Sequence, residues 1–193
     1  MYIWIGCKLP EDFEAELRRC CLEANAAVGA DTVAFSLPQH ISLKISFDAG
    51  EQTHQILDFL SGLLQKERKF YVNLESLEQT GNILWLTVQE DPRLRRLHDH
   101  LDRLLLEEFS VKQHPYDRDF KFHSTLFIDK EEKLRRLHER LRPFPLPRRL
   151  PVEDFCLGVS ETGKAGDYRV VRHIKITRTT VACASVIARI VIL

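Results

Sequence analysis

The chain has 193 residues, 44% of them hydrophobic, and 28 basic residues balance 28 acidic ones to give a formal net charge of zero. This length and apolar content suffice for a good core, so the sequence predicts one domain or two small lobes and excludes a disordered chain. The charge balance excludes the broad basic surface of a protein that binds duplex nucleic acid. Any bound anion is therefore expected at a local site.

The cysteines and the first residues indicate the compartment. Five cysteines are an odd number and no CxxC pair occurs, which favours free thiols in a reducing environment over a disulfide framework or a zinc site. Residues 2–10 have neither a basic stretch before them nor a small-residue cleavage signature, so we expect no signal peptide. A cytoplasmic protein is predicted.

Strands and helices alternate along both halves of the chain. The first half is expected to form a strand at 2–9, a helix at 10–28, a strand at 35–47, a helix at 51–69, and a hairpin of strands 69–78 and 82–89. The second half is expected to form a helix at 91–109, a strand at 119–129, a helix at 131–144, and strands at 152–160 and 168–177.

The end of the chain, residues 181–193, is an apolar tail. It is too short to span a bilayer, which needs about 20 apolar residues. The tail fits an extra strand, a segment that pairs with another subunit, or sequence foreign to the natural protein. The sequence leaves these three readings open.

The strand expected at 35–47 has one apolar and one polar face. Its odd-numbered positions are apolar apart from Gln39, whereas its even-numbered positions carry hydroxyls, a proline, Lys44 and His40. Side chains alternate between the faces of a strand, so this pattern predicts one face in a core and the other toward a polar site.

The strand expected at 119–129 repeats this design. One face is mainly apolar and carries Phe120, Phe122, Ser124, Leu126 and Ile128. The other face carries Lys121, His123, Thr125 and Phe127.

The two strands share a short motif, HISL at His40 to Leu43 and HSTL at His123 to Leu126, and each lies in a run of helix, strand, helix and hairpin. We therefore predict an α+β, two-lobed duplicated fold in which two antiparallel-rich sheets with outer helices face each other across a central cleft. The polar faces of the two motif strands would be its walls. Residues 1–180 would form this single bilobal domain with interleaved lobes.

These motifs resemble the two His-x-[Ser/Thr]-x motifs of the 2H phosphoesterase superfamily. The start of the chain, IGCKLP followed by a helix and then HISLK, is similar to its bacterial 2′-5′ RNA ligase and RNA 2′,3′-cyclic phosphodiesterase branch, the LigT-like proteins. The resemblance covers Tyr2 to about Thr177. The sequence departs from that branch after the second motif, where Phe127, Ile128 and Asp129 stand in place of a common basic residue.

The resemblance implies that His40 and His123 are the catalytic acid and base and that Ser42 and Thr125 bind phosphate. These residue types suit the opening of a cyclic phosphodiester by water, which needs one base for the attacking water and one acid for the leaving ribose oxygen. Histidine, with a pKa of about 6.5, serves in either role near neutral pH, and the hydroxyls can donate to the non-bridging oxygens. The sequence does not say which histidine is the acid.

Three further residues share the predicted polar faces. Lys44 and Lys121 are expected to neutralise phosphate, and Phe127 is expected to stack on a base. The remaining histidines form no convincing metal site, because they diverge or are isolated, and we expect them to be surface or partly buried side chains. They are His54, His98, His100, His114, His138 and His173.

The leading hypothesis is a metal-independent phosphodiesterase that hydrolyses 2′,3′-cyclic phosphates of RNA ends or small nucleotides, without a cofactor. The resemblance adds a 2′-5′ RNA ligase activity. The alternative is a non-catalytic module that binds a nucleotide or an RNA end. The expected partner in either case is an RNA end or a small cyclic nucleotide, with no membrane and no metal, and a monomer is the simplest assembly.

Overall fold

The computed structural model describes residues 1–176 of the chain, and the tail at 181–193 lies outside them. The first half contains β1 (Tyr2–Lys8), α1 (Glu11–Asn25), η1 (Val33–Ser36), β2 (His40–Asp48), η2 (Gly50–Gln52), α2 (Thr53–Leu64), β3 (Phe70–Val72), β4 (Leu74–Thr80) and β5 (Ile83–Val88). The second half contains α3 (Pro92–Phe109), η3 (Pro115–Asp117), β6 (His123–Ile128), α4 (Glu131–Leu141), β7 (Leu150–Val152), β8 (Asp154–Ser160) and β9 (Arg169–Lys175). None of the helices in this part of the chain is both long and apolar enough to cross a membrane.

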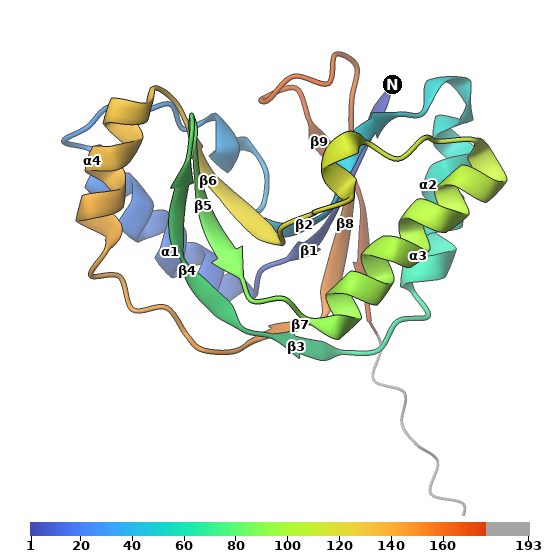
Figure 1. Ribbon diagram of the computed structural model, residues 1–193, viewed down its shortest axis with the longest axis horizontal. Coiled ribbons are helices and arrows are strands. Elements are labelled where there is room, and N and C mark those ends of the chain that lie inside the picture. The colour runs from blue at the N-terminus through green and yellow to red at the C-terminus, as the bar shows by residue number, and fades with distance from the viewer. Residues whose placement is uncertain (177–193) are drawn as a thin grey trace, which may run out of the picture.

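The strands form two main antiparallel sheets, which confirms the predicted fold class. One sheet has the order β2-β1-β8-β9 and the other the order β4-β5-β6, while β3 and β7 form a short two-stranded ribbon. Figure 1 shows the two sheets as the arms of a V, with the ribbon of β3 and β7 below them. The motif strands β2 and β6 are edge strands of their sheets, and they contact each other where the arms meet.

Each sheet is covered by helices that come from both halves of the sequence. Helices α1 and α4 pack together beside the sheet of β4, β5 and β6, whereas α2 contacts β9 and α3 contacts β2 (Figure 1). The first helix therefore crosses from the sheet that contains β1 to the opposite arm. Neither sheet with its helices is made from one continuous half of the chain.

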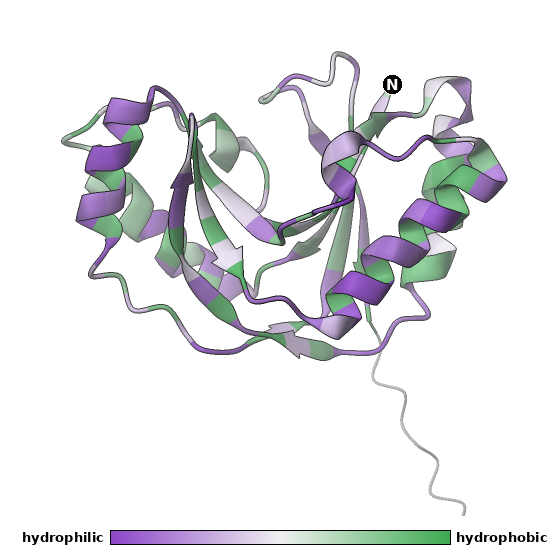
Figure 2. Cartoon of the chain, viewed as in Figure 1, coloured by the Kyte–Doolittle hydropathy of each residue, from purple (hydrophilic) through white to green (hydrophobic). Residues whose placement is uncertain are grey.

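The core follows from the apolar stripes of the helices and the inner faces of the strands. Helix α3, for example, begins at Pro92 after the capping carboxylate of Asp91, and buries leucines at helical spacing such as Leu94, Leu97 and Leu101. Figure 2 shows the hydrophilic residues of α3 and α4 alternating with hydrophobic ones around each helix. These buried residues and those of the two sheets join in one hydrophobic cluster.

Some helices and strands begin or end at other residues than the sequence predicts. The segment before His40 is not a strand, because Val33–Ser36 forms a 3-10 turn and Pro38 precedes the first ladder residue. The first helix ends at Asn25 instead of Val28, since the Asn25 amide holds both backbone groups of Ala30. The second motif strand likewise begins at His123 rather than at residue 119.

Candidate active site

The structure gives His40 and His123 the same local arrangement. Each is the first residue of its motif strand, and each Nδ1 lies within hydrogen-bond distance of the carbonyl two residues earlier. The distance is 2.8 Å from His40 to the Pro38 carbonyl and 2.7 Å from His123 to the Lys121 carbonyl. A carbonyl oxygen only accepts, so Nδ1 carries the hydrogen in both rings.

This arrangement fixes what each ring can do chemically. With the Nδ1 hydrogen donated to the backbone, the neutral ring presents an unprotonated Nε2, which can accept a proton. The protonated ring presents Nε2–H, which can donate one. His40 and His123 are therefore each built to exchange a proton at the same ring atom.

A tryptophan stacks on each of these histidines. The ring centroids of Trp4 and His40 are 4.2 Å apart with 28° between the planes, and those of Trp85 and His123 are 4.2 Å apart with 24°. Trp4 comes from β1 and Trp85 from β5, the strands that pair with the two motif strands. The hydrogen bond at Nδ1 and the stack together define the ring plane and the direction of Nε2.

Two glycines make room for the Trp4–His40 stack. A Cβ added at Gly6 would lie 2.5 Å from Cδ2 of His40, and one added at Gly158 would lie 1.9 Å from Nε1 of Trp4. Both distances are shorter than real carbon contacts, so only glycine fits at these two positions. In the other sheet Trp85 itself occupies the place opposite Thr125 that Gly6 occupies opposite Ser42.

Burial favours the neutral form of both His40 and His123 by lowering their pKa values. The pKa of His40 is lowered to about 4, mainly by burial and to a lesser extent by the nearby positive charge of His123, against the opposing hydrogen bond to Pro38. Burial also lowers the pKa of His123, against its hydrogen bond to the Lys121 carbonyl. Because the charge of His123 acts on His40, protonation of one imidazole disfavours protonation of the other.

The predicted phosphate-binding hydroxyls lie two residues beyond the histidines on the same strands. Ser42 and Thr125 are both half-buried, and their partners in the ladders are Gly6 and Trp85. Lys121 is exposed and its Nζ lies 3.3 Å from a carboxylate oxygen of Glu78. Its backbone carbonyl, which holds the His123 ring, is the part of Lys121 that reaches the histidine.

Lys44 and Phe127, predicted to line the site, are instead buried in the core. Only 4% of Lys44 and none of Phe127 is exposed. The pairing register shifts by one residue directly after Ser42 in β2 and after Thr125 in β6. A one-residue shift sends the following side chains to the other face of the strand, so strict alternation predicts the wrong side for both residues.

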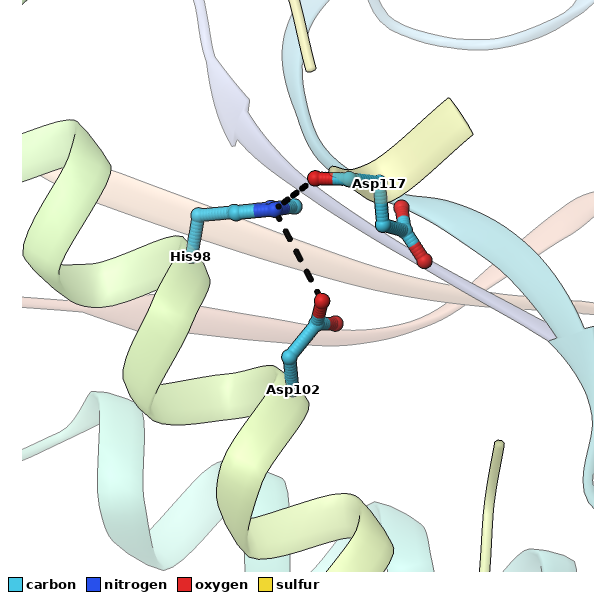
Figure 3. Close-up of side chains that lie close together, drawn as sticks. All are labelled: His98, Asp102 and Asp117. Carbon is cyan, nitrogen blue, oxygen red and sulfur yellow. Dashed lines mark hydrogen bonds and ion pairs between the residues drawn. The ribbon is translucent and has the colours of Figure 1, made fainter. Parts of the chain in front are cut away.

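Lys44 belongs to a buried charged cluster with Asp102 and Asp117. Its Nζ bonds to the Asp102 carboxylate and lies 2.6 Å from Oδ2 of Asp117. His98, which was expected at or near the surface, completes the cluster and is only 1% exposed. Its Nδ1 lies 2.7 Å from the Leu43 carbonyl. Its Nε2 lies 3.0 Å from the Asp117 carbonyl (Figure 3).

The cluster contains residue types that bind metal ions, but the ammonium group of Lys44 lies between its carboxylates. Ligand atoms of His98, Asp102 and Asp117 lie within 4.8 Å of one another. The ammonium group of Lys44 already pairs with both carboxylates, so the geometry is that of an ion-pair network. A separate groove of about 750 Å³, lined by basic residues such as Arg93 and Arg96 of α3, contains neither His40 nor His123.

Sequence reasoning missed the two tryptophans of the site. They are the only tryptophans in the chain, and each stands in a strand expected from the sequence beside a motif strand. That coincidence was a usable signal. The glycine partner of Ser42 had no comparable signal, because its role depends on which strand pairs with β2 and in which register.

A sequence profile described as the 2′-5′ RNA ligase superfamily matches residues 9–164. The chain therefore belongs to this superfamily, which is part of the 2H phosphoesterases. Membership supports a phosphodiesterase-type function in the broad sense. No curated protein matches the sequence.

Solved structures share the fold over almost the whole chain. The protein TT0787 of Thermus thermophilus is 23% identical with a TM-score of 0.64, covering 91% of this chain and 98% of its own. LigT of E. coli, in complex with 3′-AMP, is 18% identical with a TM-score of 0.60 and the same two coverages. Usb1 of Kluyveromyces marxianus is 11% identical with a TM-score of 0.50, again over 91% and 98% of the chains. At these identities the likeness concerns the fold.

Proposed function

We propose that the protein is a metal-independent phosphodiesterase that hydrolyses 2′,3′-cyclic phosphates of RNA ends or small nucleotides. The observation that supports this most directly is the matched pair of histidines, each with Nδ1 held by a backbone carbonyl and Nε2 left for proton exchange. One imidazole takes the proton of the attacking water while the other protonates the ribose oxygen that leaves phosphorus.

Ser42 and Thr125 would bind the phosphate in this reaction. Each hydroxyl lies on the same strand as a histidine and two residues beyond it, so the pair can donate hydrogen bonds to the two non-bridging oxygens. Such bonds strengthen as negative charge develops on these oxygens in the transition state. Lys121, exposed beside the His123 strand, would add positive charge for the substrate.

Small nucleotides and RNA ends are the proposed substrates because a related fold binds a nucleotide, as in the complex of E. coli LigT with 3′-AMP. A 5′-hydroxyl in place of water would convert the same reaction into 2′-5′ ligation.

We further propose a cytoplasmic location, supported by the free thiols of Cys7, Cys20, Cys21 and Cys156.

The test is hydrolysis of 2′,3′-cyclic mononucleotides and of an oligonucleotide ending in a cyclic phosphate, with a chelator present throughout. The wild-type protein should cleave, and His40→Ala, His123→Ala and the double variant should lose most turnover, typically about 100-fold or more for a general acid or base. His54→Ala is the matched control, because His54 is an exposed histidine of α2.

The position of the product phosphate shows which ribose oxygen leaves. Loss of activity in the chelator would indicate a metal route, and near-wild-type rates in either single histidine variant would exclude the two-histidine mechanism. Nucleotide binding without turnover of any cyclic phosphate would identify a binding module instead.

A further inference from the structure

Two buried polar side chains lie at the starts of the motif strands, Gln39 directly before β2 and Ser124 in β6, and the fold brings them together. The Ser124 hydroxyl donates a hydrogen bond of 3.0 Å to Oε1 of Gln39. Gln39 is 2% exposed and Ser124 is 1% exposed, so water does not compete for either group. A polar group left unpaired at such a place destabilises the fold, so this contact is the reason that both residues can be buried.

Each member of the pair is the direct neighbour of one histidine. Gln39 precedes His40, and Ser124 follows His123. Strands β2 and β6 belong to different sheets, so a hydrogen-bonded ladder within one sheet does not set their spacing. The Gln39–Ser124 bond bridges the two sheets at the level of the histidines.

Gln39 is also anchored on its own side of the bridge. Its Nε2 donates 3.1 Å to the Ala34 carbonyl of η1, and its backbone N–H donates 3.0 Å to the Glu14 carboxylate of α1. Its carbonyl accepts from the backbone N–H of Leu9, 2.9 Å away. A residue whose side chain and backbone are tied to three other segments can transmit a fixed position to Ser124.

We propose that the Gln39–Ser124 hydrogen bond is a positioning strut that sets the separation of His40 and His123. The inference rests on the proposed function, in which an acid and a base must stand on opposite sides of phosphorus. Misplacement of a reacting group by about 1 Å can cost about 100-fold in rate. Neither residue touches the substrate in this scheme; both act through the adjacent histidines.

The first experiment compares Ser124→Ala, Gln39→Met and the double variant by steady-state kinetics and by thermal unfolding. Each single variant leaves the other group buried without its partner, so each should lower the melting temperature and reduce kcat by about tenfold or more, with KM changed by less than about threefold. The double variant removes both polar groups and should regain stability. Its kcat should stay low, because the strut is still missing.

Ser160→Ala is the matched control, because Ser160 is a serine of β8 that is 2% exposed and accepts backbone hydrogen bonds from Thr162 and Gly163. It should lose stability without the drop in kcat, and Ser124→Thr, which keeps the hydroxyl, should retain more activity than Ser124→Ala. Recovery of kcat together with stability in the double variant would reduce the pair to a structural role and overturn the proposal.

A second measurement separates failure of the strut from failure of the proposed function. If the wild-type protein cleaves no cyclic phosphate, the function fails, and NMR titration of the histidine rings still tests the strut. In Ser124→Ala the pKa of His40 should rise toward its ordinary value, because looser strands admit water and weaken the effect of the His123 charge. An unchanged His40 titration in Ser124→Ala would overturn the strut independently of any activity.

Discussion

The imidazole of His40 lies on the indole of Trp4 with 4.2 Å between the ring centroids, and the opposite sheet repeats this relationship with His123 and Trp85. In each case the tryptophan belongs to the strand that pairs with the motif strand. The chain thus supports each histidine by a neighbouring strand of the same sheet and by its own backbone. Both supports constrain the ring without using Nε2.

Replacement of Trp85 by leucine should impair turnover more than folding. Leucine cannot form the flat contact with His123, which for an aromatic pair is worth about 0.5–1.5 kcal/mol, and the freed ring would lose its fixed direction. We expect kcat to fall by about tenfold while KM changes little.

Trp85→Phe is the informative companion to Trp85→Leu, because Nε1 of Trp85 has no hydrogen-bond partner among residues 1–176 and phenylalanine keeps the stacking surface. It should retain most of the activity. Tyr71→Leu, at an aromatic residue that is 43% exposed, serves as the control. Equal rates for Trp85→Leu and wild type would show that the stack does not orient His123.

Gly6→Ala should damage the site by a different route. The new methyl group would lie 2.5 Å from the His40 ring and 3.0 Å from Trp4, so the imidazole must turn away from its present plane. We expect a loss of kcat of at least about tenfold, together with a modest loss of stability from overpacking. Gly62→Ala, where an added Cβ meets no atom within 4 Å, is the control. A fully active Gly6→Ala enzyme would mean that the ring position of His40 is not critical.

Much of the fold could be predicted from the sequence because the repeated pattern is strong. Alternation in the two motif strands predicted a shared polar face for His40, Ser42, His123 and Thr125, and all four are half-buried and precede the shifts in register. Alternation failed for the two residues that follow those shifts, Lys44 and Phe127. A bulge depends on how two strands pair, and one strand read alone contains no information about its partner.

Buried polar residues were the other class that sequence reasoning placed poorly. His98 lies on a helix rich in charged residues and was expected to be exposed or partly buried, yet both of its ring nitrogens contact buried backbone carbonyls, those of Leu43 in β2 and Asp117 in η3. Gln39 was visible as an exception on an apolar face. Its partner Ser124 follows it by 85 positions, and only the meeting of the two sheets makes them neighbours.

The buried position of Lys44 predicts a large effect on stability. Lys44→Met removes the cation between Asp102 and Asp117 and leaves two buried carboxylates without it. Breaking a buried ion pair in this way typically costs about 3–5 kcal/mol, measured here as the free energy of unfolding in urea. Lys121→Met, which breaks an exposed pair with Glu78, should cost less than about 1 kcal/mol.

The same variant distinguishes the core position of Lys44 from a role in substrate binding. Assayed well below its melting temperature, Lys44→Met should keep KM within about twofold of wild type, because the side chain faces away from the histidines. A KM raised tenfold in a stable Lys44→Met protein would return Lys44 to the substrate site.

The pH dependence of kcat/KM should assign the two histidines. In the free protein the pKa of His40 is about 4, lowered partly by the positive charge of His123. As the pH falls, His123 is therefore protonated before His40. The base must be neutral and the acid protonated, which makes His40 the base and His123 the acid. Burial lowers the pKa of His123 too, so kcat/KM should decline as the pH rises through a value below the ordinary 6.5 of histidine, where the acid loses its proton. It should also decline as the pH falls through about 4, where the base becomes protonated.

A variant of each histidine tests this assignment, because each should remove one of the two declines in the pH profile. The residual activity of His40→Asn should lack the decline near pH 4, and that of His123→Asn should lack the alkaline decline. The profile of kcat should lie at higher pH than that of kcat/KM, because the negative charge of a bound phosphodiester raises both pKa values. If the alkaline decline instead persists in His123→Asn and disappears in His40→Asn, the two roles are reversed. His123 would then take the proton from water, and the lowered pKa of His40 would not identify it as the base.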